Sequence, residues 1–127
     1  MPCRYVIDSE RRLVVSTGWD RVTFAEMKAH QDKLASDPDF HPEFDQFVDA
    51  TAVTTLEASP DELKTIISRR LYSPTSRRAF VASNLHVLGL GRVMEMYAKM
   101  TGEREQVRLF HDRVEALQWL GLENPPR

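Results

Sequence analysis

The sequence predicts an α/β fold built on a mixed sheet of about five strands with four helices. Two β-rich runs at residues 3–7 and 13–17 flank a polar turn, which predicts an antiparallel hairpin. From residue 23 onward, amphipathic helical patterns alternate with short apolar runs, so we expect parallel strands joined by crossover helices. The 127 residues suffice for one domain with its own core, expected over residues 1–122 with a loose tail at residues 123–127.

The composition is that of an ordinary globular chain, with 42% hydrophobic and 28% charged residues. The formal net charge of −2 provides no general attraction to nucleic acid or to anionic lipid. Cys3 is the single cysteine, so no internal disulfide is possible, and a reducing, cytoplasmic setting is favoured. We expect neither a signal peptide nor a membrane span, because no apolar run approaches the roughly 20 residues that a span needs.

The hairpin has a clear pattern of alternating faces. In its second strand Leu13 and Val15 share one face, whereas Val14 and Ser16 share the other. Residues 18–20 contain a glycine and an aspartate and are expected to end that strand.

The first helix is predicted to begin at Thr23, because Glu26 three residues later completes a capping box. Pro38 ends it, since the residue before a proline disfavours the helical conformation. One face of this helix is mostly apolar and carries Phe24, Met27, Gln31 and Leu34.

The central stretch predicts a buried strand at residues 47–50, a loop, and a sharply capped helix. Ser59 and Glu62 form a second capping box, with Pro60 at the first helical position. Asp49 falls at the predicted end of the strand. Open α/β sheets bind ligands where a strand ends and the next helix begins, so this stretch is the predicted site.

Residues 79–82 form a continuous apolar run that predicts a strand covered on both faces. Asn84 is expected to cap the helix that follows. Leu90 and Met94 fall off the predicted core face of this helix, so we expect a homodimer with both residues near its interface. The predicted core face consists of Leu85, Leu88, Val93, Met96, Tyr97 and Met100.

The same helix contains Gly89 and Gly91, which predict either the close approach of a neighbouring strand or ligand, or an irregular first turn. Residues 101–102, a Thr-Gly pair, are expected to end it. A last strand at residues 107–110 precedes a final helix that Asp112 caps.

The order of these elements resembles the sulfate-transporter and anti-sigma-factor-antagonist (STAS) superfamily, and its SpoIIAA-like branch in particular. The resemblance covers nearly the whole chain and depends on the order of several short motifs. These motifs are Trp19-x-x-Val22-Thr23-x-x-Glu26, Asp37-Pro38-x-Phe40, the strand end Val48-Asp49-Ala50-Thr51, the helix start Glu57-Ala58-Ser59-Pro60, Gly89-Leu90-Gly91-Arg92, and Ala116-x-x-Trp119-Leu120.

The resemblance implies the fold and a regulatory contact surface, but this sequence departs from the family at its switch. The family's phosphoacceptor is the hydroxyl residue directly after the acidic residue, and Ala58 occupies that place here. Pro60 replaces the glycine of the motif. Ser59 therefore has two interpretations: an N-cap, or a phosphoacceptor or anion contact at the helix start.

If the ends of neighbouring strands meet, five polar residues are predicted to line one shallow rim that binds a ligand or partner. These residues are Asp49, Thr51, Ser59, Asn84 and His86.

No catalytic set can be identified. The four histidines lack metal-ligand spacing, and Cys3 has no base nearby in sequence. We therefore predict a non-catalytic STAS-like module, without metal or cofactor, that binds a protein partner or regulates by association. The alternative is a carrier with an apolar pocket for a small molecule, lipid or acyl chain, supported by the many Leu, Met and Phe residues around the third helix.

Overall fold

A computed structural model describes residues 2–69, 71–100 and 106–122. One five-stranded sheet runs through the molecule in the order β1-β2-β3-β4-β5. β1 pairs with β2 antiparallel and every later pair is parallel, so the predicted mixed sheet with four helices is confirmed. In chain order the elements are β1 (Cys3–Asp8), β2 (Leu13–Thr23), α1 (Phe24–Ala35), β3 (Asp45–Glu57), α2 (Pro60–Ser68), β4 (Arg78–Ala82), α3 (Leu85–Met100), β5 (Val107–Phe110) and α4 (Arg113–Trp119).

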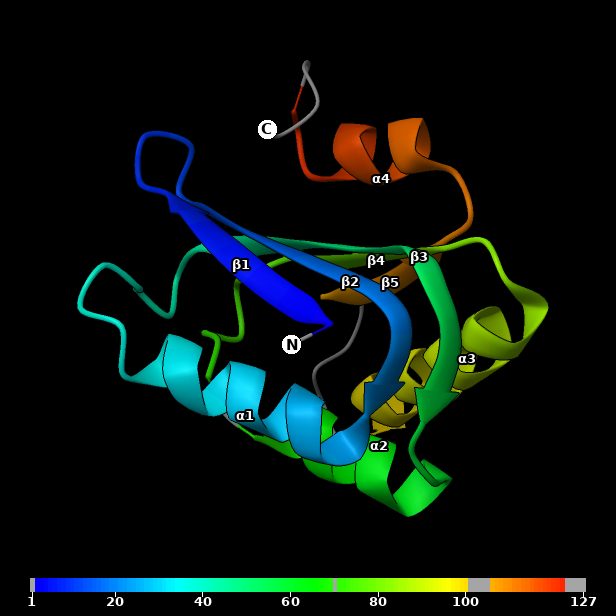
Figure 1. Ribbon diagram of the computed structural model, residues 1–127. Helices are drawn as coiled ribbons and strands as arrows, with labels where there is room; N and C mark the ends of the chain where they lie inside the picture. Colours follow the sequence, from blue (N-terminus) through cyan, green and yellow to red (C-terminus); the bar gives the residue numbers. More distant parts are fainter. Residues whose placement is uncertain (1, 70, 101–105, 123–127) are drawn as a thin grey trace.

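The helices are divided unequally between the two faces of the sheet (Figure 1). Because the strands are neighbours in chain order, three successive crossovers of one hand place α1, α2 and α3 on the same face. Only α4, which follows the last strand, lies over the opposite face. We call these the three-helix face and the α4 face.

β2 and β3 are much longer than the sequence predicts. Residues 18–20 do not end the strand as predicted. The pairing of β2 with β3 has two register irregularities there, and β2 then continues to Thr23. The predicted loop after Ala50 is strand as far as Glu57, and it pairs with β2 on both sides of the two register irregularities. Both strands bend toward the helices in this second half (Figure 1). Bulges absorb the irregular residues and increase strand twist, which is why pairing survives them.

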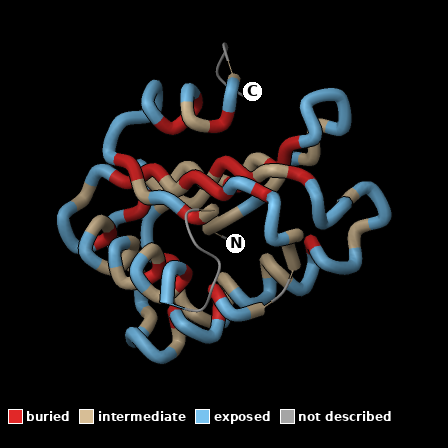
Figure 2. The backbone as a smooth tube through the Cα atoms, turned by 180° about the vertical axis from the view of Figure 1, so that it is seen from behind, coloured by how far each residue is buried: buried red, intermediate tan, exposed pale blue. Residues whose placement is uncertain are grey.

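The α4 face is tightly packed. Phe47 and Ala79 are both fully buried there, against a cluster that includes Ala116 and Leu117 of α4. The alternation predicted for β2 is confirmed, since Leu13 joins this cluster while Val14 packs with Leu34 of α1 on the other face. Figure 2 shows the buried residues gathered along the sheet and the outward sides of the helices exposed.

The predicted core face of α3 is only partly correct: Leu88 and Tyr97 pack against the buried clusters, but three of its other residues are exposed. Leu85, Met96 and Met100 are 86%, 62% and 78% exposed, whereas Met94 is only 6% exposed. Met94 belongs to the core cluster of α2 and α3, and Leu90 packs against that cluster. The reason for placing Leu90 and Met94 at a dimer interface is therefore removed, because both residues contribute to the core of a single chain.

Gly91 explains the orientation of α3. A Cβ atom at this position would lie 2.8 Å from Cδ1 of Leu109 on β5, so the missing side chain permits this face of the helix to approach the sheet. The predicted close approach of a strand is thus found at Gly91. A Cβ atom on Gly89 would meet nothing within 4 Å. The predicted helix end at residues 101–102 and the tail at residues 123–127 lie outside the described residues.

Both capping boxes are confirmed. The Thr23 hydroxyl accepts from the Glu26 amide at 3.2 Å, and the Glu26 carboxylate accepts from the Thr23 amide at 3.0 Å. Ser59 and Glu62 repeat the arrangement at 3.1 and 2.9 Å. These local pairs fix where α1 and α2 begin, and thereby how the helices lie across the sheet.

Candidate functional site: an apolar cavity with a polar end

The three-helix face of the sheet is not fully covered. Val48 and Ala50 of β3 and Phe80 of β4 point toward the helices from the centre of the sheet, yet each keeps partial exposure. Their neighbours on the α4 face, Phe47 and Ala79, are completely buried. The sheet and the three-helix layer are therefore not in full contact, and space remains between them.

This space is a cavity of about 150 Å³ with a predominantly apolar lining. Side chains from the sheet and from α1, α2 and α3 all contribute to its wall. An engineered protein cavity of similar size stays dry and takes up benzene. The cavity is also open to solvent along part of its boundary, so it suits a small apolar group and allows a longer chain to extend out of it. Representative lining residues are Val48, Ala50, Phe80, Met27, Ile66 and Met94.

Three polar side chains in the wall are joined by hydrogen bonds. Ser16 of β2 is 5% exposed, and its Oγ lies 3.0 Å from Nε2 of His30 on α1. The side-chain amide of Gln46 on β3 donates to the same Oγ at 2.9 Å. When His30 Nε2 is unprotonated, the serine hydroxyl donates to it and the three groups form one directed chain.

The environment favours the neutral form of His30. Burial in the protein lowers the pKa of His30, and the charge of nearby Lys33 acts in the same direction. The Tyr5 ring packs against the imidazole in an edge-to-face arrangement with a centroid distance of 5.4 Å. Burial, together with a 2.7 Å hydrogen bond donated to Asp37, raises the pKa of Tyr5 to about 12.

Arg78 and Tyr72 complete the polar end of the cavity. Arg78 is 6% exposed and is the Cα partner of Gln46 on the adjacent strand, so both side chains point toward the helices. Its guanidinium carbon lies 5.3 Å from the centre of the Tyr72 ring. The Tyr72 hydroxyl is buried and has no hydrogen-bond partner in the described part of the chain. Burial raises the pKa of Tyr72 well above its ordinary value, so the hydroxyl remains a donor.

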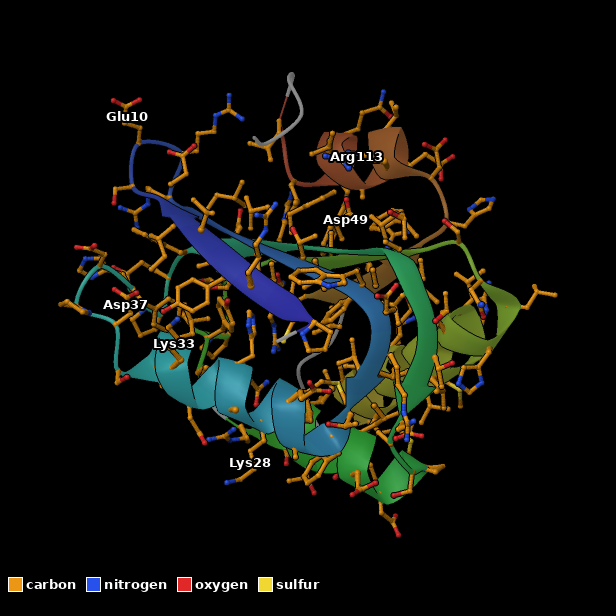
Figure 3. All side chains as sticks on the ribbon, in the orientation of Figure 1. Glu10, Lys28, Lys33, Asp37, Asp49 and Arg113 are labelled. Carbon is orange, nitrogen blue, oxygen red and sulfur yellow. The ribbon has the colours of Figure 1, made fainter. Side chains whose placement is uncertain are left out.

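The predicted site residues are not gathered into one rim. Asp49 lies within β3 rather than at its end, on the α4 face, and accepts from Arg113 of α4 at 2.6 Å (Figure 3). The same carboxylate accepts from the amide and hydroxyl of Thr51 at 3.0 and 2.6 Å. Asp49 and Thr51 therefore meet, and the contact of Asp49 with Arg113 attaches α4 to the sheet.

The other three predicted residues have structural contacts on the opposite side. Asn84 caps α3 by accepting from the amide of His86 at 2.8 Å, and its own amide donates to the carbonyl of Thr54. His86 Nε2 lies 3.3 Å from the carbonyl of Leu56. Asn84 and His86 thus hold the start of α3 to the second half of β3, while Ser59 caps α2.

The sequence reasoning did not identify Ser16, His30 and Gln46. One signal for them was present, because Ser16 shares the helix-facing side of β2 with apolar Val14. A second signal is Gln31, a polar residue on the apolar face of α1 next to His30, which also lines the cavity. Polar residues that interrupt the core-facing pattern of several elements indicate a polar site inside the fold.

The described residues contain no group of three or more His, Cys, Asp or Glu side chains able to hold a metal ion. Ser16 and His30 have the contact of a nucleophile and base, but Ser16 is the single hydrogen-bond partner of the His30 imidazole within residues 2–69, 71–100 and 106–122. Burial raises the pKa of Cys3 in the cavity wall, which disfavours a reactive thiolate. No described helix is long and apolar enough to cross a membrane.

The sheet order and the helix distribution define an α/β protein with a SpoIIAA-like fold. The structure is similar to the crystal structure of an uncharacterized protein of the DUF3478 family from Shewanella loihica PV-4, described as having that fold. The match covers 93% of each chain with a TM-score of 0.59 and 19% sequence identity, which supports the fold alone. A scan against family profiles and a search of curated proteins give no match.

Proposed function

We propose that this protein is a non-catalytic binding module that holds a small apolar or acyl-chain ligand between its sheet and α1, α2 and α3. The observation that supports this proposal most directly is the partial exposure of Val48, Ala50 and Phe80 at the centre of the sheet. Cores normally pack without voids larger than a water molecule, so retained space beneath a helix layer needs an occupant or a purpose. The single cysteine agrees with a reducing, cytoplasmic setting, which we include in the proposal.

The proposal excludes catalysis because the polar groups of the cavity lack the arrangement that a reaction requires. A serine nucleophile needs a base that a third group orients, and donors placed to stabilise a developing oxyanion. The donor nearest Ser16 is the amide of Gln46, and it is already directed at the serine oxygen itself. A polar chain used in this way fixes the cavity wall and presents hydrogen-bonding groups to a ligand.

The test uses two alanines of β3. Ala50→Leu places a larger side chain in the cavity, whereas Ala52→Leu adds the same group at an exposed position outside it. We expect the wild-type protein and Ala52→Leu to enhance the fluorescence of N-phenyl-1-naphthylamine equally, with at least tenfold weaker binding by Ala50→Leu. Circular dichroism checks that both variants fold.

Native mass spectrometry of the freshly purified protein provides the complementary measurement. A retained ligand mass that disappears in Ala50→Leu supports the carrier function. Equal probe binding by both variants, or no binding by the wild-type protein, would contradict it.

A second candidate function is self-association through the outer face of α3. Leu85, Met96 and Met100 are large apolar residues that remain exposed on this helix, and such exposure is typical of an interface. We propose a homodimer formed through these residues in place of Leu90 and Met94. Light scattering at tens of micromolar tests it: a dimer that Met96→Lys converts to a monomer supports the proposal, and a wild-type monomer contradicts it.

A further inference from the structure

We propose that the cavity selects a single-chain carboxylic acid, with its head group at the polar end formed by Ser16, His30, Gln46, Tyr72 and Arg78. This inference rests on the proposed carrier function and adds the chemical class of the ligand. It follows from the order of side chains on the sheet, from the donors that the polar end presents, and from the charge of the lining.

The polar groups occupy one end of the cavity because of the strand register. Gln46 and Arg78 are partners on β3 and β4, close to where both strands begin. Ser16 lies on β2 beside this pair and accepts from Gln46. The opposite end, toward the carboxyl ends of the strands, is lined by apolar Val53 and Val87. A ligand with one polar head and one apolar chain matches this division.

The polar end is rich in donors. The Gln46 amide carries two N–H groups, of which one is directed to Ser16. The Tyr72 hydroxyl is buried and has no hydrogen-bond partner among the described residues. Buried polar groups are nearly always hydrogen-bonded in folded proteins, so an oxygen atom of a bound ligand would satisfy this donor. A carboxylate accepts several such bonds at once and donates none.

The charge of the lining favours an acid over an amine. Arg78 contributes a permanent positive charge to the wall. The described lining residues include no aspartate, glutamate or lysine. The lining therefore presents an environment in which a carboxylate head is attracted and an ammonium head is repelled.

The test compares three ligands with the same chain: octanoic acid, 1-octanol and octylamine. Each is used to displace N-phenyl-1-naphthylamine from the wild-type protein at neutral pH. We expect octanoic acid to displace the probe at a concentration at least tenfold lower than octanol, and octylamine to be the weakest of the three. Tyr72→Phe should weaken octanoic acid about tenfold, while the matched variant Tyr97→Phe, on α3 and outside the lining, should have no effect.

The outcomes separate the two proposals. If the probe binds and all three ligands displace it equally, the head-group selection is wrong and the carrier function stands. The same conclusion holds if octylamine binds most tightly, or if Tyr72→Phe leaves the affinity for octanoic acid unchanged. If the wild-type protein binds neither the probe nor any of the three ligands, the carrier function fails and the inference fails with it.

Discussion

Ser16 Oγ lies 3.0 Å from His30 Nε2, and this contact joins the second strand to the first helix inside the fold. Gln46 extends the contact to β3 through its 2.9 Å hydrogen bond to the same oxygen. A buried polar chain costs stability unless all its members are satisfied. Its position at the edge of an apolar cavity makes it the feature that most distinguishes this interior from an ordinary hydrophobic core.

Acidification should destabilise the protein through His30. The folded state holds this pKa below its usual value, mainly by burial, so the unfolded chain binds a proton more readily. The contribution of His30 is fully present above the ordinary histidine pKa of about 6.5, and it is lost as pH falls from there toward the lowered pKa of the folded state. Urea unfolding of wild type and His30→Gln between pH 8 and pH 5 measures this dependence.

The variant His30→Gln should show a smaller loss of unfolding free energy over that range, because glutamine does not titrate. His111→Gln, at an exposed position, is the matched control and should follow the wild-type curve. If the unfolding free energies of wild type and His30→Gln fall in parallel with pH, burial of His30 is not the cause of the acid destabilisation.

Replacing Ser59 with alanine should lower the free energy of unfolding by about 1 kcal/mol, because the cap of α2 is lost. Thr23→Ala should have a similar effect at α1, where the same capping box occurs. Chemical denaturation measures both changes, with Ser68→Ala, at the end of α2, as a control expected to change little. A stability equal to wild type in Ser59→Ala, together with a loss of anion binding, would favour the alternative interpretation of Ser59 as a contact residue.

The Asp49–Arg113 ion pair should contribute modestly to the attachment of α4. The Arg113 side chain is 42% exposed and that of Asp49 is 14% exposed, so solvent screens much of the attraction. A double-mutant cycle with Asp49→Asn and Arg113→Met should therefore give a coupling energy of about 0.5–1 kcal/mol that weakens in high salt. A coupling energy near zero would show that Asp49 is available for another role.

The two glycines of α3 should respond differently to alanine. Gly89→Ala should raise the free energy of unfolding by about 0.5–1 kcal/mol, because helix propensity improves and nothing occupies the space. Gly91→Ala should leave the free energy of unfolding unchanged or lower it, because the new Cβ atom would press on Leu109. Thermal unfolding of the two variants compares them directly. Equal stabilisation by both would mean that α3 is free to shift away from β5.

Much of the fold could be predicted because the relevant interactions are local. Thr23 with Glu26 and Ser59 with Glu62 are three residues apart, so their capping boxes can be identified from the sequence alone. The long pairing of β2 with β3 could not, because Gly18 and Asp20 are typical strand breakers. Only the pairing itself shows that extra residues on β3 absorb the irregularity and let both strands continue. Likewise, α3 is apolar on more than one side, and its buried face is selected by the contact of Gly91 with β5.

The candidate site was less predictable than the fold. In the sequence, Ser16 is 14 residues from His30 and 30 residues from Gln46. No local motif therefore connects the three residues. Asp49 looked like a site residue because it follows a short apolar run, but the strand continues past it to Glu57. Its carboxylate is instead paired with Arg113, 64 residues away in the chain.

The most direct test of the binding function is methyl NMR of the protein titrated with octanoic acid. Ligand in the cavity should shift the methyl signals of Val48, Val53 and Met94, which line it. The methyl signals of Val6 and Val114, exposed at 52% and 60% and outside the cavity wall, should remain unchanged. Shifts confined to exposed Leu85, Met96 and Met100 on α3, or no shifts at all, would contradict an interior binding site.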